Sequence, residues 1–172
     1  MTVNSANACV PQPVMAMFPL EGALWRGACS SSLVPSVVTS VRVARMEDSS
    51  AACELLRRSI LELCVVDHNN DPEVLSAWLG NKTPENVASW FSSPQHFAVV
   101  ALHDDVVTGV ALLTRKGKVC LCHVAPEARH TGTGRALLEA LERQAMAWDI
   151  GTLQVASTLV AQEFYRRNGY VP

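Results

Sequence analysis

The sequence has few charged and few aromatic residues, and it lacks any apolar run long enough to cross a membrane. Charged residues make up 17% of its 172 residues and aromatic residues 6%, and the formal net charge is −2. No cluster of lysine and arginine stands out, which argues against nucleic acid as a partner. No apolar stretch approaches about 20 residues, so we expect no membrane association and a cytoplasmic location. The hydrophobic share of 49% suffices for the core of one globular domain.

Cysteines are present, but their spacing lacks the pairs that hold metals. The six occur at positions 9, 29, 53, 64, 120 and 122, and none forms a C-x-x-C motif. We interpret them as reduced thiols that pack as small apolar residues. Cys120 and Cys122 lie two apart in an expected strand and should share one face of it. A zinc site would need a second ligand pair elsewhere, which we do not find, so we predict no metal.

The first forty residues lack regular patterning. Pro13 and Pro19 interrupt their apolar stretches, and no Lys or Arg precedes Arg26. A secretory signal needs a positive start and an unbroken apolar core, so this segment does not match one. We interpret residues 1–40 as an irregular extension and residues 41–172 as the folded domain.

From residue 41 onward, helix and strand signals alternate in the order of a layered α/β (α+β) fold. Three strands follow one another closely, joined by the turns HDD and RKGK, which predicts an antiparallel meander. A right-handed crossover would make the next strand parallel to the third. The result is a mixed, mostly antiparallel sheet flanked by helices. Strands are expected at 41–45, 96–102, 106–114, 119–125 and 152–157, and helices at 47–66, 72–80, 84–91, 134–148 and 158–170.

Several residues mark where these helices start and how their turns are linked. Asp71 should cap the helix that begins with Pro72. Asp48 or Ser49 should cap the first helix, and Ser157 or Thr158 the last one. In the long helix near the C-terminus, Glu139 and Arg143 are spaced to pair across one turn.

The segment RHTGTG, Arg129–Gly134, places two glycines where a strand gives way to a helix. The first N–H groups of a helix lack intrahelical acceptors, and the helix dipole adds positive potential there. Gly132 and Gly134 would let a phosphate approach the main chain closely, and Arg129 and Arg135 would attract it. The segment lacks the Gly-Lys-Ser/Thr of a P-loop and the third glycine of a dinucleotide fingerprint. On glycines alone, a purely structural turn is an equal alternative.

Two separate motifs resemble the GNAT superfamily of N-acetyltransferases. HVAPEARHTGTGRALLEALERQA resembles the acetyl-CoA-binding segment of the family, with Arg129, Gly132 and Gly134 in their places and Val124 and Pro126 matching a V-x-P upstream. STLVAQEFYRRNGY resembles the C-terminal helix, through Phe164, Tyr165, Gly169 and Tyr170. RSILELCVVDHNNDPEVLSAWLG resembles the first two helices of many bacterial members. The likeness covers residues 41–172.

The resemblance implies direct transfer of an acetyl group from acetyl-CoA to a primary amine within a ternary complex. It implies that the Val124 amide lies near the thioester carbonyl and that Tyr165 acts as general acid, although packing is the alternative for this side chain. His123 is a candidate general base, the alternative being an ordinary strand histidine. Glu62, Asp67 and His68 either line the acceptor pocket or are solvated helix-end groups. The cosubstrate-binding set is Val124, Arg129, His130, Thr131, Gly132, Thr133, Gly134 and Arg135.

The sequence departs from the family pattern in three places. Cys120 stands where many relatives carry a glutamate, and His130 and Thr131 stand where many have Gly and Arg. We expect the final strand of the family sheet to be missing or reduced to a stub after Tyr170, and an uncovered sheet edge would favour a homodimer. These departures keep a second interpretation open, namely a non-catalytic CoA-binding or interaction module that retains the GNAT fold.

Overall fold

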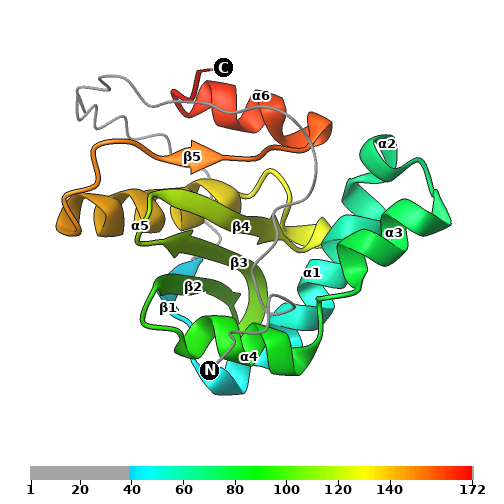
Figure 1. The fold of residues 1–172 in the computed structure, drawn as a ribbon, viewed down its shortest axis with the longest axis horizontal. Helices are drawn as coiled ribbons and strands as arrows, with labels where there is room; N and C mark the ends of the chain where they lie inside the picture. The colour runs from blue at the N-terminus through cyan, green and yellow to red at the C-terminus, as the bar shows by residue number, and fades with distance from the viewer. Residues whose placement is uncertain (1–38, 172) are drawn as a thin grey trace, which may run out of the picture.

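A computed structural model describes residues 39–171 as a mixed sheet with helices on both faces (Figure 1). The predicted N-terminal extension lies, except for its last two residues, outside the described residues. The elements are β1 (Ser40–Val43), η2 (Met46–Asp48), α1 (Ser49–Leu63), α2 (Val65–His68), α3 (Pro72–Leu79), α4 (Pro84–Ser92), β2 (His96–His103), β3 (Val106–Thr114), β4 (Lys118–Val124), η3 (Pro126–Ala128), α5 (Thr133–Ala147), β5 (Gln154–Val155) and α6 (Leu159–Arg167).

The sheet has the predicted strand order and directions. Its five strands lie in the order β1-β2-β3-β4-β5, and β1 to β4 pair antiparallel. β5 pairs parallel to β4, as the crossover through α5 predicted. Within residues 39–171 no strand follows α6. The expected class, a mixed and mostly antiparallel sheet flanked by helices, is therefore confirmed.

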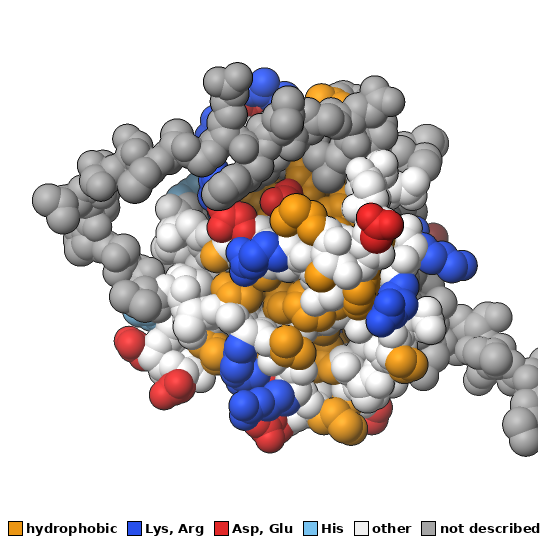
Figure 2. All heavy atoms as spheres, turned by 90° about the vertical axis from the view of Figure 1, so that its left-hand side faces the viewer, with side chains coloured by type: hydrophobic (Ala, Val, Ile, Leu, Met, Phe, Trp, Pro, Cys, Tyr) orange, Lys and Arg blue, Asp and Glu red, His pale blue; other side chains and the backbone are white. Residues whose placement is uncertain are grey.

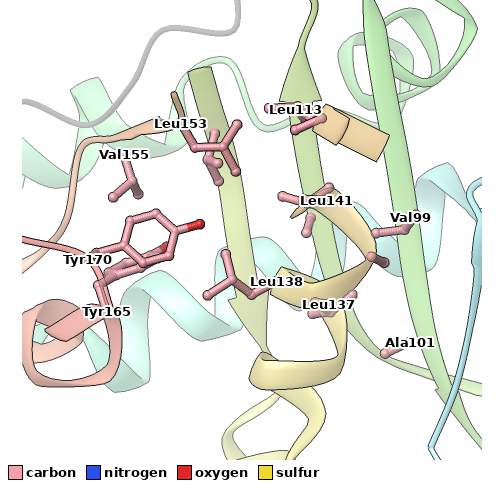
Figure 3. Packing of buried hydrophobic residues seen from close by; sticks show 14 residues of the cluster. Val99, Ala101, Leu113, Leu137, Leu138, Leu141, Leu153, Val155, Tyr165 and Tyr170 are labelled. Atoms are coloured by element: carbon pink, nitrogen blue, oxygen red, sulfur yellow. The ribbon is translucent and has the colours of Figure 1, made fainter. Parts of the chain in front are cut away.

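The strands alternate their side chains between two hydrophobic layers. In β2, Val99 and Ala101 belong to the layer under α5 and α6, whereas Val100 faces the layer under α1 and α4. Figure 3 shows the first layer, where Leu137 and Leu141 of α5 lie against the sheet. A period of two along a strand produces this division, and burial on both faces fixes the register of the sheet.

A β-bulge in β4 overturns one expectation about the cysteines. Leu112 of β3 pairs with Leu121 and Leu113 pairs with Val119, so Cys120 is an extra residue on β4. Cys122 consequently packs in the layer under α5 and α6, and Cys120 in the opposite layer. The expectation that the two thiols share one face was wrong, because it assumed an unbroken strand period.

The helix starts show which capping predictions hold. Asp71 Oδ1 accepts hydrogen bonds from the N–H groups of Glu73 and Val74 at 2.8 and 3.2 Å, as predicted. Asp48 occupies the N-cap position of α1, but its side chain does not cap that helix. Its carboxylate instead receives two hydrogen bonds from the Arg42 guanidinium, at 2.7 and 2.8 Å. This ion pair fastens β1 to the start of α1, and the pKa of Asp48 is lowered by it.

The surface mixes charges of both signs with apolar side chains. The face shown in Figure 2 interleaves lysine or arginine with aspartate or glutamate around hydrophobic atoms. On α5, Glu139 accepts from Arg135 Nε at 2.8 Å, so the pair forms one turn earlier than the predicted Glu139–Arg143 pair. Among the described residues, no helix has both the length and the apolarity that a membrane span requires.

Candidate functional site

One cavity of about 500 Å³ lies where β4 and β5 separate. The parallel ladder comprises only the pairs Lys118–Gln154 and Val119–Val155. Beyond Val119, β4 lines the cavity up to Val124. The other walls come from the end of α1, from the loop before α5 and from α6. The parting of the two strands thus turns one edge of β4 toward a space that a ligand could enter.

The loop before α5 contains two residues in the left-handed conformation. Gly132 is the N-cap of α5 and has φ of 92°, a value that L side chains rarely adopt. A Cβ built on Gly132 would meet nothing within 4 Å, so its main chain borders open space. His130 also has a positive φ, 62°, which costs a non-glycine residue about 1 kcal/mol. Both residues line the cavity together with Arg129.

The two threonines of the loop face away from the cavity. Thr131 Oγ1 donates to the Ala128 carbonyl at 2.8 Å and lies 2.8 Å from Thr133 Oγ1. Thr133 is buried, and neither threonine is among the residues lining the cavity. Their side chains hold the loop in shape, so any contact of theirs with a ligand would have to come from the main chain.

Gly134 is favoured by close packing as well as by ligand approach. A Cβ at this position would lie 3.3 Å from the Phe164 ring of α6 and 3.8 Å from Val124 Cγ1. The missing side chain therefore lets the start of α5, the end of β4 and α6 meet closely. Arg135 follows, lines the cavity and keeps its bond to Glu139. The sequence suggested the glycine, but its partner Phe164 could be identified only from the fold.

His123 lies on β4 at the α1 side of the cavity. Its Nδ1 lies 3.0 Å from the hydroxyl of Ser59, a buried residue of α1 that also lines the cavity. Burial, and after it the positive charge of Lys82, lower the pKa of His123 to about 4. His123 is therefore neutral at physiological pH. If Nδ1 donates to Ser59, Nε2 is left as an acceptor, which is the tautomer that a base requires.

Tyr165 is both part of the core and part of the cavity wall. Its ring packs against Phe164 and Tyr170, at centroid distances of 5.1 and 5.5 Å, and Figure 3 shows it close to Tyr170. Burial and a hydrogen bond with Cys122 raise the pKa of Tyr165 well above its usual value. The phenol is thus protonated at neutral pH while lining the cavity. The two roles considered for Tyr165, packing and proton donation, are compatible in this position.

None of the three polar residues at the end of the first helices lines the cavity. Glu62 pairs with Arg58 at 3.2 Å. His68 is buried, with Nε2 3.1 Å from the Ile60 carbonyl. Asp67 Oδ1 accepts from the Leu159 N–H at 2.6 Å and so caps α6 across a sequence separation of 92 residues.

The bond from Asp67 corrects the predicted cap of α6. Thr158 occupies the N-cap position, but its side chain does not cap the helix, and the Ser157 hydroxyl donates to the Thr158 carbonyl. Of the two alternatives considered for Asp67, an acceptor-pocket residue or a solvated helix-end group, the structure supports neither fully, because its carboxylate caps α6 and so links α2 to the helix that carries Tyr165. Sequence reasoning missed several residues that line the cavity, Ser59 and Lys82 among them. Ser59 falls in a segment that was recognised only as a helix of the family, and Lys82 belongs to no recognised motif.

A family model described as an acetyltransferase (GNAT) domain matches residues 66–172. The chain belongs to the GNAT acetyltransferase family. The matched range includes β4, the loop before α5, and α6, so it contains both motifs that suggested the resemblance. The expected superfamily and the expected enzyme class, an acetyl-CoA-dependent N-acetyltransferase, are confirmed. No curated protein matches the chain by sequence.

Solved structures show the same fold at low sequence identity. A GCN5-related N-acetyltransferase from Rhodopseudomonas palustris is 24% identical with a TM-score of 0.72, covering 81% of this chain and 86% of its own. PaiA N-acetyltransferase from Thermoplasma acidophilum, solved in complex with coenzyme A, is 19% identical with a TM-score of 0.65, covering 76% and 87%. The ribosomal-protein-S18-alanine N-acetyltransferase from Escherichia coli is 18% identical with a TM-score of 0.57, covering 77% of each chain. At these identities the likeness establishes the fold alone.

Proposed function

We propose that this GNAT protein transfers the acetyl group of acetyl-CoA to a primary amine by direct attack within a ternary complex. The observation that carries the proposal is a single cavity that brings together the loop before α5, the unpaired edge of β4 and Tyr165. The loop and Tyr165 belong to motifs that lie some thirty residues apart in the sequence, and the fold makes them walls of one space.

In this proposal the diphosphate of acetyl-CoA binds to the main chain at the start of α5. The hydrogen bond from Ala136 N to the Gly132 carbonyl closes the first turn of α5, so the N–H groups before Ala136 lie at its open end. Those groups and the helix dipole attract anions. Arg129 and Arg135 line the same end of the cavity and add positive charge. The pantetheine arm would then follow the edge of β4 toward Val124.

The chemical step requires the amine nitrogen to attack the thioester carbon. A new C–N bond forms, negative charge develops on the carbonyl oxygen, and the C–S bond breaks as the tetrahedral intermediate collapses. The Val124 N–H would stabilise the developing oxyanion. Tyr165 would protonate the departing thiolate, since its phenol is protonated at neutral pH. His123, neutral at that pH, would accept the amine proton directly or through water.

A location in the cytoplasm is part of the proposal. Cys53, Cys64, Cys120 and Cys122 are thiols rather than disulfides, which fits a reducing compartment. No metal enters the proposed chemistry. Within residues 39–171, no three His, Cys, Asp or Glu side chains are grouped as metal ligands. The homodimer expected from an uncovered sheet edge stays a prediction.

The two tyrosines of the chain supply a matched test. Tyr165 lines the cavity. Tyr170 packs against the Tyr165 ring in the core, and its hydroxyl donates a hydrogen bond to Glu142 at 3.2 Å. Release of CoA thiol from acetyl-CoA across an amine panel should show that Tyr165→Phe lowers kcat by about a hundredfold, the usual worth of a general acid. Tyr170→Phe, which removes an equally buried hydroxyl, should leave kcat within about twofold of wild type. Normal turnover in Tyr165→Phe would show that Tyr165 is not the general acid.

The second interpretation, a CoA-binding module without turnover, is favoured by the scarcity of carboxylates in the site. Glu163 is the one carboxylate that lines the cavity among the described residues, and Arg166 and Arg167 both donate to it. These two arginines lower the pKa of Glu163 to about 2, below the value of about 4 for His123, so Glu163 is the weaker base of the two. Binding of CoA without thiol release for any amine would support the module and contradict the transferase.

A further inference from the structure

The α1 side of the cavity contains a lysine that the proposed mechanism does not use. Lys82 lies between α3 and α4, lines the cavity and is only 4% exposed. Lysine is among the residues least often buried, because removing an ammonium group from water is costly. A buried ammonium in the wall of a ligand cavity is therefore a candidate for a functional role.

Bonds on both sides of Lys82 hold it in place before any ligand arrives. Its carbonyl accepts from Cys53 Sγ at 3.1 Å and from Arg57 Nη1 at 3.2 Å, both on α1. Its Nζ donates to the Trp78 carbonyl at 3.0 Å and to Asn81 Oδ1 at 2.7 Å. A group that is already ordered loses little conformational entropy when it binds a ligand, so this ammonium is well suited to recognition.

The charge of Lys82 reaches the proposed acceptor end of the cavity. After burial, this positive charge is the second cause of the lowered pKa of His123. Ser59 and His123 are bonded to each other and line the cavity with Lys82. We call these three residues the acceptor end of the cavity and the loop 129–134 its diphosphate end.

The residues lining the cavity carry an excess of positive charge. Glu163 is the single carboxylate among them, and two arginines bind it. Bound diphosphate would offset Arg129 and Arg135 at the loop, but Lys82 belongs to the connection between α3 and α4 and lines the cavity together with His123. An acceptor with a second ammonium group would meet like charge there, whereas a carboxylate would meet a fixed donor of opposite charge. The cations lining the cavity are Lys82, Arg129, Arg135 and Arg167.

Building on the proposed function, we infer that the acceptor is a small amino-carboxylate, whose carboxylate binds the Lys82 ammonium while its amine is presented to the thioester beside His123. Free amino acids have this chemistry, with an amine and a carboxylate within a few bonds of each other. Polyamines and aminoglycosides, which carry several cations and no carboxylate, are disfavoured acceptors.

The test compares amino acids with their own carboxamides as acceptors for the full-length chain. Glycine, β-alanine, L-alanine and L-methionine are each assayed beside the corresponding amide, with spermidine as a polycation, by thiol release from acetyl-CoA. The amine of an amide is less basic and thus more often unprotonated, so this bias works against the expected result. Wild type should use at least one acid with a KM about tenfold or more below that of its amide.

Substitutions at Lys82 assign the preference to this residue. Lys82→Met, which keeps the length of the side chain, should raise the KM for the acid about tenfold or more and leave the KM for acetyl-CoA unchanged. Lys82→Arg should retain the preference even if Lys82→Met folds poorly, and Lys116→Met, at an exposed turn, controls for the loss of one positive charge. Circular dichroism melting establishes that each variant is folded.

The possible failures are distinguishable. Equal or better use of the amides by wild type, or an unchanged acid preference in folded Lys82→Met, would overturn the inference while leaving acetyl transfer intact. Absence of thiol release with every amine, despite binding of CoA, would overturn the proposed function itself and the acceptor assignment with it.

Discussion

The half-buried imidazole of His123 should make the fold sensitive to mild acid. Its pKa is about 4 in the folded chain and about 6.5 when the chain is unfolded, so the unfolded state takes up a proton first as the pH falls. The contribution of His123 to the free energy of unfolding is therefore fully present above about pH 6.5, declines as the pH falls toward 4, and is constant below that pH. This direction is the one expected for a base whose charged form is disfavoured by burial.

The size of the effect follows from the two pKa values. Proton linkage between 6.5 and about 4 gives a loss of roughly 2.5 kcal/mol on going from about pH 7.5 to about pH 4.5. The cavity gives His123 some access to water, so we expect about 1–2.5 kcal/mol. Acidic groups such as Asp48, whose pKa is lowered by Arg42, add their own losses to the total as the pH falls. The contribution of His123 must therefore be taken from a comparison of variants.

Urea denaturation of wild type and of His123→Gln at the two pH values isolates the contribution. The loss of unfolding free energy between them should be smaller in His123→Gln by about 1–2.5 kcal/mol. His103→Gln, which replaces an exposed histidine at the end of β2, should keep the wild-type loss. An equal loss in wild type and His123→Gln would refute the conclusion that the folded chain holds this imidazole neutral.

Three further substitutions test how the site is built. Asp67→Ala should lower the free energy of unfolding by about 1 kcal/mol because α6 loses its cap, and Asp67→Asn, which keeps a hydrogen-bond acceptor, should lower it by less. Equal urea midpoints for wild type and Asp67→Ala would contradict the assignment of Asp67 as the cap of α6. Gly134→Val should cost about 1–3 kcal/mol by overpacking against Phe164 and weaken CoA binding, whereas Gly151→Val, where a Cβ meets nothing within 4 Å, should leave CoA affinity unchanged in the same titration. Gly132→Ala should cost about 1 kcal/mol because of its left-handed φ, measured by thermal melting, and an unchanged melting temperature would argue against that conformation.

Local signals predicted most of the fold because the elements involved are determined by nearby residues. The turns between 96 and 125 joined strands of matching period, and the meander followed. Asp71 capped the helix immediately after it. By contrast, the bulge at Cys120 depends on how β4 pairs with β3, and the sequence of one strand alone does not determine that pairing. The strand pattern alone therefore placed Cys120 and Cys122 on one face, whereas they pack in opposite layers.

The parts of the site that escaped prediction come from segments far apart in the chain. The cap of α6 is supplied by Asp67, and the partner of Gly134 is Phe164. Lys82 belongs to no motif and becomes notable only through its burial in the cavity wall. The loop before α5 could be singled out from the sequence because glycines at a helix start have a local physical meaning, and its role in binding stays a prediction.

The central claim is that main-chain groups at the start of α5 bind the diphosphate of coenzyme A. Calorimetric titration of the folded chain with CoA, and separately with pantetheine, which lacks the diphosphate and the 3′-phosphoadenosine attached to it, tests it most directly. We predict one CoA per chain and an affinity for pantetheine at least about tenfold weaker, since each charge-assisted hydrogen bond to the diphosphate is worth about 1.5–3 kcal/mol. Absence of CoA binding by folded protein, or equal affinity for the two ligands, would contradict the account.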